Sequence, residues 1–378
     1  MAGFVEYWRR SRVKIETGKQ SLALELGRLQ AIVEKKSTMP ILSNVLIKTT
    51  HGGITLMATD LDAWIMTFVD AQVLEEGEAC IPAKKLYEIV KALPDASIDL
   101  ATGDKQANIK CQRSNFRLAI LPTDNFPAPP APAAAYHHIQ PEVMRTFIER
   151  TSFAITIESS RYTLNAAKFI ITSSLAKMVT TDGHRLAYIE KPIVWDGPDC
   201  DVLIPQKTIG LLAKMAESTE PIEFAQFEGK LYFRIGKRMI VSRMLAGQFP
   251  DYTRIFPDHK AVAAIVNNDA MLAALKRVQI VADDRSHGIK MEVAPHEDIK
   301  LGASTAELGE SSELVECEYK GSDVKIGINA TYVTDYFSRM VGADRTRMMI
   351  TDSASALEFK PVTTDDVIYR YIVMPLRT

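Results

Sequence analysis

Three residues that could carry out acid–base chemistry lie close together near the middle of the chain, at Asp182, His184 and Arg185. A carboxylate, an imidazole and a guanidinium at this spacing could form a hydrolytic site if a nucleophile and an oriented base lay nearby. The sequence contains no nucleophile elbow and no phosphate-binding glycine loop, and the GxGxxG, Walker A and HExxH signatures are absent. We therefore favour a non-catalytic role, and keep a hydrolase that uses these three residues as the alternative.

The pair Thr181-Asp182, which opens this stretch, recurs as Thr59-Asp60, 122 residues earlier. The earlier pair continues as Leu61-Asp62, without a histidine or an arginine. Because Asp-Gly is a strong turn former, a shared pair with variable neighbours indicates a turn of a repeated fold. The hexapeptide Thr181–Leu186 is thus expected to be a turn that displays its side chains.

Apolar residues at helical spacing predict six helices along the chain. The predicted helices cover residues 22–33, 86–93, 144–148, 209–215, 272–278 and 333–340. Two of them directly follow the Ile-Pro steps that end at Pro82 and Pro205, and the last follows Ile328-Asn329. Pro82, Pro205 and Asn329 are separated by 123 and 124 residues, so we infer three copies of one unit.

Segments of strand character lie between the predicted helices. The clearest cover residues 98–100, 116–120, 231–235, 240–244, 348–351 and 368–373. Two helices and several mostly antiparallel strands per copy predict the α+β fold class. A proline-rich linker over 125–138 and a boundary at Phe256-Pro257-Asp258 separate the copies. The expected domains are 13–134, 135–257 and 258–378, after an N-terminal extension over 1–12.

The composition is that of an ordinary globular protein, with 47% hydrophobic and 24% charged residues. The sequence contains neither an apolar run of membrane-spanning length nor a secretory signal, so a cytoplasmic location is expected. The four cysteines are scattered without a CxxC pair, which favours reduced thiols over disulfides or a zinc site. We expect no metal and no cofactor.

The net charge of −2 gives no general argument for a nucleic-acid partner. Lysines and arginines nevertheless lie on or beside all six predicted helices, while acidic residues concentrate in 75–78 and 307–318. This distribution is consistent with one surface that faces nucleic acid. Contacts to phosphates there would be independent of base sequence and sensitive to salt.

Several segments, KKSTMPILSN, ITLMATDLD, TTDGHRLA, GQFPDYTRIFP and YIVMPLRT, together resemble the bacterial DNA polymerase III β subunit, the sliding clamp family. The resemblance runs from about Val13 to Thr378 through all three repeats. It implies a head-to-tail homodimer whose repeated clamp domains form a six-domain ring around double-stranded DNA. The implied function is that of a non-enzymatic processivity factor for the replicative polymerase. An accessory clamp copy that confers inhibitor tolerance is the alternative within the family.

The family binds its partners through short peptides that dock in an apolar pocket between the second and third domains. The resemblance implies that this pocket comprises Leu164, Thr181, Gly183, His184, Arg185, Leu186, Pro250, Arg254, Ile255, Ile372, Met374, Pro375, Leu376 and Arg377. The expected partners are the DNA polymerase III α subunit, the clamp loader δ subunit, and repair and translesion polymerases. They should compete for the pocket.

The resemblance also implies a DNA-contacting set and a dimer interface. The DNA-contacting residues would be Lys36, Arg161, Tyr162 and Lys207. The interface would place Lys85, Arg113, Phe116 and Leu118 of the first domain against Ile280, Val281, Glu307 and Glu310 of the third.

Overall fold

The computed structural model describes residues 12–33, 38–130, 135–158, 160–215, 219–257, 260–340, 342–363 and 366–376. The chain divides into two compact units. Unit 1 contains Met1–Glu142 and Lys207–Met244, and unit 2 contains Val143–Gln206 and Leu245–Thr378.

All six predicted helices are present in the described part of the chain. They are α1 (Lys19–Leu29), α2 (Ala83–Ala92), α3 (Pro141–Thr151), α4 (Gln206–Met215), α5 (Asn268–Val278) and α6 (Ala330–Phe337). The last two have asparagine N-caps, because the Asn267 and Asn329 side chains accept hydrogen bonds from backbone amides of the first turn. The helices bury one apolar face each, as their spacing predicted.

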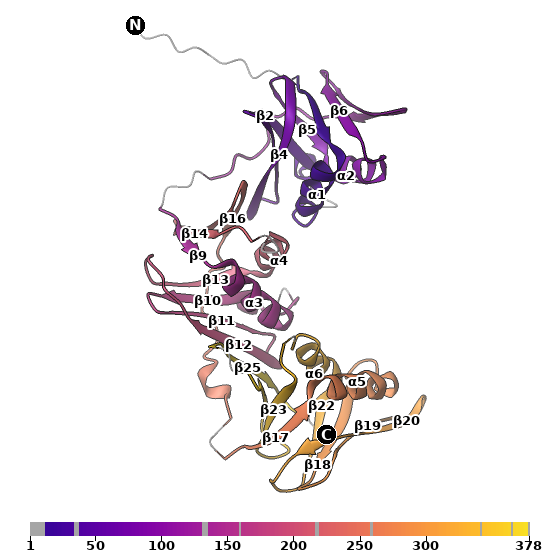
Figure 1. Cartoon of the computed structure of the whole chain (residues 1–378), viewed down its shortest axis with the longest axis vertical. Coiled ribbons are helices and arrows are strands. Elements are labelled where there is room, and N and C mark those ends of the chain that lie inside the picture. Colours follow the sequence, from indigo (N-terminus) through magenta and orange to yellow (C-terminus); the bar gives the residue numbers. More distant parts are fainter. Residues whose placement is uncertain are drawn as a thin grey trace. The chain divides into compact units, whose positions relative to one another are not determined.

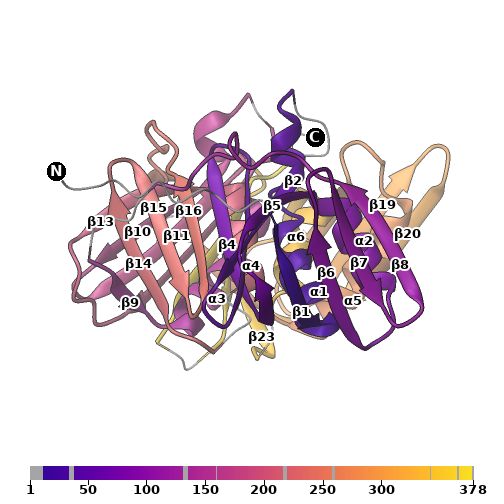
Figure 2. The same cartoon turned by 90° about the horizontal axis from the view of Figure 1, so that it is seen from above.

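Unit 1 is built on a sheet that has twelve strands among the described residues, with the path β8-β7-β6-β1-β4-β16-β15-β14-β9. The strands are β1 (Lys14–Gly18), β2 (Asn44–Thr50), β3 (Gly53–Thr59), β4 (Ala63–Glu75), β5 (Glu78–Pro82), β6 (Ser97–Thr102), β7 (Gln106–Cys111), β8 (Ser114–Ala119), β9 (His137–Ile139), β14 (Ile222–Phe227), β15 (Lys230–Ile235) and β16 (Arg238–Arg243). Helices α1 and α2 lie side by side against it (Figure 1). Strands β6, β7 and β8 run next to one another to one edge (Figure 2).

Unit 2 contains two sheets, of nine and four strands among the described residues. The nine-stranded sheet comprises β10 (Ala166–Thr172), β11 (Leu175–Thr181), β12 (Arg185–Pro192), β13 (Cys200–Pro205), β17 (Val262–Asn267), β21 (Cys317–Glu318), β23 (Arg345–Ile350), β24 (Leu357–Pro361) and β25 (Ile368–Val373). The four-stranded sheet follows the order β20-β19-β18-β22, with β18 (Gly288–Val293), β19 (Ile299–Thr305), β20 (Gly309–Val315) and β22 (Val324–Asn329). Helices α5 and α6 pack against each other (Figure 1).

Two antiparallel strand pairs connect one sequence repeat to the next inside these sheets. In unit 1, β4 pairs with β16, and we call this the first joint. In unit 2, β12 pairs with β25, which we call the second joint. Each joint is therefore made by main-chain hydrogen bonds of a continuous sheet.

Over the described ranges, no helix is long and apolar enough to cross a membrane. No disulfide joins the four cysteines, which all lie in the described ranges, and Cys80, Cys111 and Cys200 are buried.

Candidate functional site

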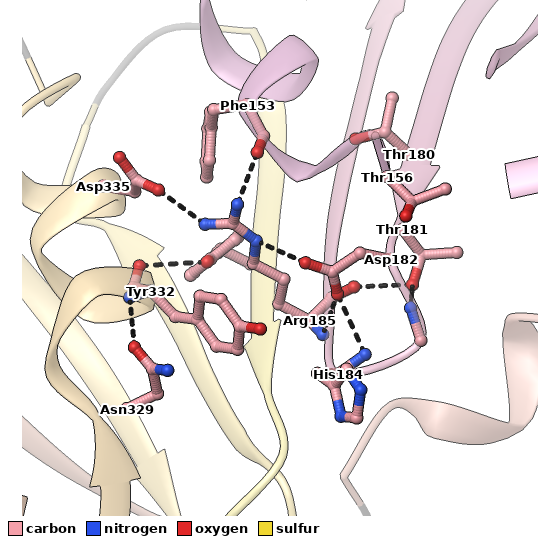
Figure 3. Close-up of polar contacts among 12 residues, drawn as sticks. Phe153, Thr156, Thr180, Thr181, Asp182, His184, Arg185, Asn329, Tyr332 and Asp335 are labelled. Atoms are coloured by element: carbon pink, nitrogen blue, oxygen red, sulfur yellow. Dashed lines mark hydrogen bonds and ion pairs between the residues drawn. The ribbon is translucent and has the colours of Figure 1, made fainter. Parts of the chain in front are cut away.

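The hexapeptide Thr181–Leu186 forms the tight turn between β11 and β12, as predicted (Figure 3). The Asp182 Oδ1 atom accepts hydrogen bonds from the backbone amides of His184 at 2.9 Å and Arg185 at 3.0 Å. Gly183 has a φ of +89°, in the left-handed region that favours glycine. The backbone of the turn is thus set by the Asp and the Gly. The His184 side chain is displayed from it as predicted, whereas the Arg185 side chain is largely buried.

The same turn recurs at Thr59-Asp60 in unit 1. There the Asp60 Oδ1 atom accepts from the amides of Asp62 at 3.1 Å and Ala63 at 2.8 Å. Leu61 takes the place of Gly183 and also has a positive φ, +77°. The recurrence confirms that the Thr-Asp pair is part of the repeated fold.

Arg185 is the most constrained side chain of the turn, with 11% of its side chain exposed. Its Nε donates to Asp182 Oδ2 at 2.9 Å, its Nη1 to Asp335 Oδ2 at 2.6 Å, and its Nη2 to the carbonyl of Phe153 at 2.6 Å (Figure 3). The guanidinium also stacks over the ring of Tyr332, with 4.4 Å to its centroid. All three nitrogens of Arg185 are therefore engaged within the protein.

These contacts also determine the charge of Arg185. Burial lowers the pKa of the guanidinium, but the oxygens of Tyr371, Asp335 and Asp182 outweigh this effect, so its pKa is raised overall. A permanently charged arginine cannot exchange protons. Both carboxylate oxygens of Asp182 are engaged as well, because they accept three hydrogen bonds from within the turn.

The C-terminal segment lies against this turn. Strand β25 pairs with β12, and Leu186 lies opposite Ile372. Beyond the strand, the Met374 amide donates to the carbonyl of His184 at 2.9 Å, and the Leu376 amide donates to the carbonyl of Gly327 at 2.8 Å. The segment after β25 is thus fixed to both the β12 turn and strand β22.

An apolar cluster lies on one face of this joint and includes three residues of the predicted pocket, Leu164, Leu186 and Ile372. Besides Leu186 and Ile372, its buried members are Ala166, Val179, Tyr188, Leu203 and Phe249. Leu164 is partly buried and packs against them, as do Leu245, Tyr252, Phe256 and Ala356. We call this set the pocket cluster. The aromatic residues were not among the predicted site residues, although the FPDYTRIF segment that supplies three of them was recognised.

The remaining predicted pocket residues differ in exposure. Thr181 is buried, Pro375 and Leu376 are half-buried, and Gly183, His184, Pro250, Arg254, Ile255 and Met374 are exposed. Arg254 forms an ion pair with Asp251 at 3.0 Å. Arg377 lies outside the described residues.

Of the predicted DNA-contacting residues, Arg161 and Tyr162 lie next to the pocket cluster in sequence and space. Tyr162 is exposed and begins the short 3-10 helix Tyr162–Leu164. The Arg161 guanidinium donates to the carbonyl of Asp182 in the turn. Lys207 forms an ion pair with Asp60, in the turn at Thr59-Asp60 of unit 1. Lys36 lies outside the described residues.

The predicted dimer-interface residues lie on or near two edge strands. Phe116, 39% exposed, and Leu118 are on β8, which ends the unit 1 sheet. Glu310 is on β20, which ends the four-stranded sheet of unit 2, and Glu307 lies just before it. Ile280 is 72% exposed, and Val281 follows it in the 3-10 helix Gln279–Val281. Arg113 is exposed, and Lys85 pairs with Glu88 of its own helix at 2.8 Å.

The chain matches three domain families of the DNA polymerase III beta subunit. The N-terminal domain family matches residues 13–130, the central domain family 138–251 and the C-terminal domain family 253–377. The β sliding clamp of Caulobacter vibrioides is 32% identical over 376 residues, which cover 97% of this chain and 100% of that protein.

Solved clamp structures have the same fold. The C. crescentus β sliding clamp, crystallised with PEG, is 32% identical and superimposes with a TM-score of 0.89 over 98% of this chain and 100% of that one. The Pseudomonas aeruginosa clamp bound to griselimycin is 28% identical, with a TM-score of 0.86 over 97% of this chain and 100% of that one.

These matches, and the engagement of Asp182 and Arg185 inside the fold, show that the hydrolase alternative is wrong. The chain belongs to the family of the DNA polymerase III β subunit, the β sliding clamp, a non-catalytic processivity factor of DNA replication.

Proposed function

We propose that two copies of this chain close head to tail into a ring around double-stranded DNA, and that the pocket cluster binds short peptides of partner proteins. The peptide-binding proposal rests on one observation: the apolar pocket cluster lies beside a turn that is ordered without a ligand. The turn is held by Asp182, Arg185 and Asp335, so a peptide would meet a preorganised surface. Each chain would contribute three clamp domains, over 13–134, 135–257 and 258–378.

The two edge strands support the dimer. An unpaired strand edge is a template for pairing with another chain, and both β8 and β20 end their sheets in the described structure. In a head-to-tail dimer, β8 of one copy would meet β20 of the other, with Phe116 and Leu118 packing against Ile280 and Val281. The positive Lys85 and Arg113 would face Glu307 and Glu310.

DNA would be held by enclosure, with weak contacts to its phosphates from Arg161, Lys207 and Lys36 and from the hydroxyl of Tyr162. Such contacts carry no base specificity and permit sliding. The test is to load the protein onto closed circular DNA and then to linearise the DNA. A ring remains bound to the circle and leaves after linearisation, whereas retention on the linear form would contradict encirclement.

An apolar anchor would dock against the pocket cluster beside the partly buried Leu164, above the buried Leu186 and Ile372. His184 and Met374 are exposed next to it. Its proposed ligands are segments of the DNA polymerase III α subunit, the clamp loader δ subunit, and repair and translesion polymerases. We also propose that griselimycin, with which the P. aeruginosa clamp was crystallised, binds here.

A fluorescent pentapeptide with leucine and phenylalanine anchors tests the pocket directly. Griselimycin should displace it, and His184→Ala should weaken its binding while the dimer persists. Full binding by a Leu186→Asp variant that remains folded would show that the peptide binds elsewhere.

A replication clamp acts where the chromosome lies, so we propose a cytoplasmic location. The accessory-copy alternative has its own test. Depleting this protein from cells should stop replication if it is the replicative clamp, and should change only inhibitor tolerance if it is an accessory copy.

A further inference from the structure

The first and second joints are built on the same main-chain plan. In unit 1 the Arg243 amide donates to the carbonyl of Asp62 at 2.8 Å. In unit 2 the Met374 amide donates to the carbonyl of His184 at 2.9 Å. Asp62 precedes His184 by 122 residues, the same offset that separates the two Thr-Asp turns. Asp62 and Arg243 of the first joint are therefore the counterparts of His184 and Met374 at the second.

The strand registers identify further counterparts. At the second joint, neighbouring strands place Thr181, Leu186, Ile372 and Glu358 in one row across the sheet. At the first joint, the equivalent row is Thr59, Trp64, Val241 and Tyr232. Trp64 thus occupies the position of Leu186, and Val241 that of Ile372. A counterpart of the peptide pocket is expected beside Trp64.

The first joint places the larger residue Trp64, 7% exposed, where the second joint has Leu186, 1% exposed. The indole forms a buried cluster with Ala225, Tyr232 and Val241, and the partly buried Met66, Tyr136, Phe227 and Met239 pack against this cluster. Its Nε1 atom is buried and has no hydrogen-bond partner among the described residues. An unpaired buried N–H is unfavourable, so the indole contributes at this position through the volume that it fills and not through a hydrogen bond.

The two joints also differ in the exposed residues next to these clusters, which we call the margin of each joint. The counterparts of His184 and Met374 are Asp62 and Arg243, which form an exposed ion pair at 3.5 Å. Where the second joint presents an exposed methionine side chain, the first presents a charged pair. A charged margin disfavours an apolar peptide anchor, because desolvating the ion pair costs free energy.

We infer that Trp64 and the Asp62–Arg243 ion pair close the first-joint counterpart of the pocket, so that each chain offers one peptide site where the repeat would otherwise provide two. The inference rests on the peptide-binding role proposed for the second joint. Trp64 would then determine specificity, because its side chain takes the space in which a peptide side chain would bind at the first joint.

The experiment copies the second joint onto the first with the double variant Trp64→Leu/Arg243→Met. Titration with the leucine–phenylalanine pentapeptide should give one site per chain in the parent and two in the variant. The matched control is Trp195→Leu, which removes a buried tryptophan outside both joints and should leave one site. A folded double variant that still binds one peptide per chain would overturn the inference.

A reciprocal variant keeps the test decisive if the double variant does not fold. Met374→Arg changes an exposed side chain and copies the first-joint margin onto the pocket. Combined with His184→Asp, it should weaken peptide binding at least tenfold, and unchanged affinity would count against the inference. A parent protein that binds no peptide would instead refute the proposed pocket.

Discussion

Arg185 donates a hydrogen bond from Nη1 to Oδ2 of Asp335 at 2.6 Å, although 150 residues separate the two positions. This bond ties the β12 turn to helix α6, and the other oxygen of Asp335 accepts from Arg339 at 3.2 Å. Replacing Asp335 by Asn removes one of the two carboxylates that pair with the largely buried Arg185 guanidinium and leaves Asp182 as its remaining carboxylate partner. We expect a loss of about 2 to 3 kcal/mol in the free energy of unfolding, measured by urea denaturation.

Asp62→Asn is the matched control for this prediction, because it removes the same charge from an arginine pair. Since Asp62 and Arg243 are both exposed, the loss should stay below about 1 kcal/mol. Equal effects of the two substitutions would mean that burial of Arg185 does not strengthen its ion pair.

Ile280→Asp should convert the dimer into monomers, because it would place an unpaired carboxylate in the proposed interface. Sedimentation velocity measures the change. Val194→Asp provides the control, since Val194 is 96% exposed and lies outside the proposed interface. A dimeric Ile280→Asp variant would refute the interface assignment.

Ending the chain after Val373 should weaken pentapeptide binding at least tenfold and leave the dimer intact. The deletion removes the Met374 and Leu376 amides, which donate to the His184 and Gly327 carbonyls. Peptide titration and sedimentation of the same sample separate the two effects. Loss of the dimer would show that this segment has a different role.

Two buried thiols should make the protein less stable at alkaline pH. Burial raises the pKa of Cys80 and of Cys200 from 9.0 to about 12, and the charges of Glu78 and Asp201 add to the effect. Between pH 9 and 12 the unfolded thiols lose protons that the folded thiols keep, so stability falls as pH rises, by about 1.4 kcal/mol per pH unit for each thiol.

The double variant Cys80→Ala/Cys200→Ala lacks both thiols, so its unfolding free energy should fall less steeply above pH 9 than that of the parent. Urea denaturation at pH 8, 9 and 10 measures the slopes. A constant difference between variant and parent at all three values would contradict the predicted titration.

The helices and the repeated turn were predictable because their signals are local or periodic. Leu22 and Leu26 share a helical face, and Asp60 and Asp182 recur at a fixed offset. The partners of Arg185 were not predictable. Asp335 lies on α6, and nothing in its neighbouring sequence distinguishes a residue that binds Arg185 from one that faces solvent.

The same limit applies to the aromatic residues of the pocket cluster. Tyr188 and Phe256 pack edge to face at 5.6 Å, a contact between positions 68 residues apart. Their membership follows from strand register and from the course of the segment after Phe249, which sequence spacing does not specify. The pairing of β12 with β25 determines on which face of the sheet these aromatic side chains lie.

The joints also bear on how such a repeat can diversify. Because Arg243 and Met374 make equivalent bonds through their backbone amides, the bonds place little demand on either side chain. One duplicated surface could therefore become a closed, charged patch and another an open, apolar one, while the assembly of the sheet was inherited unchanged.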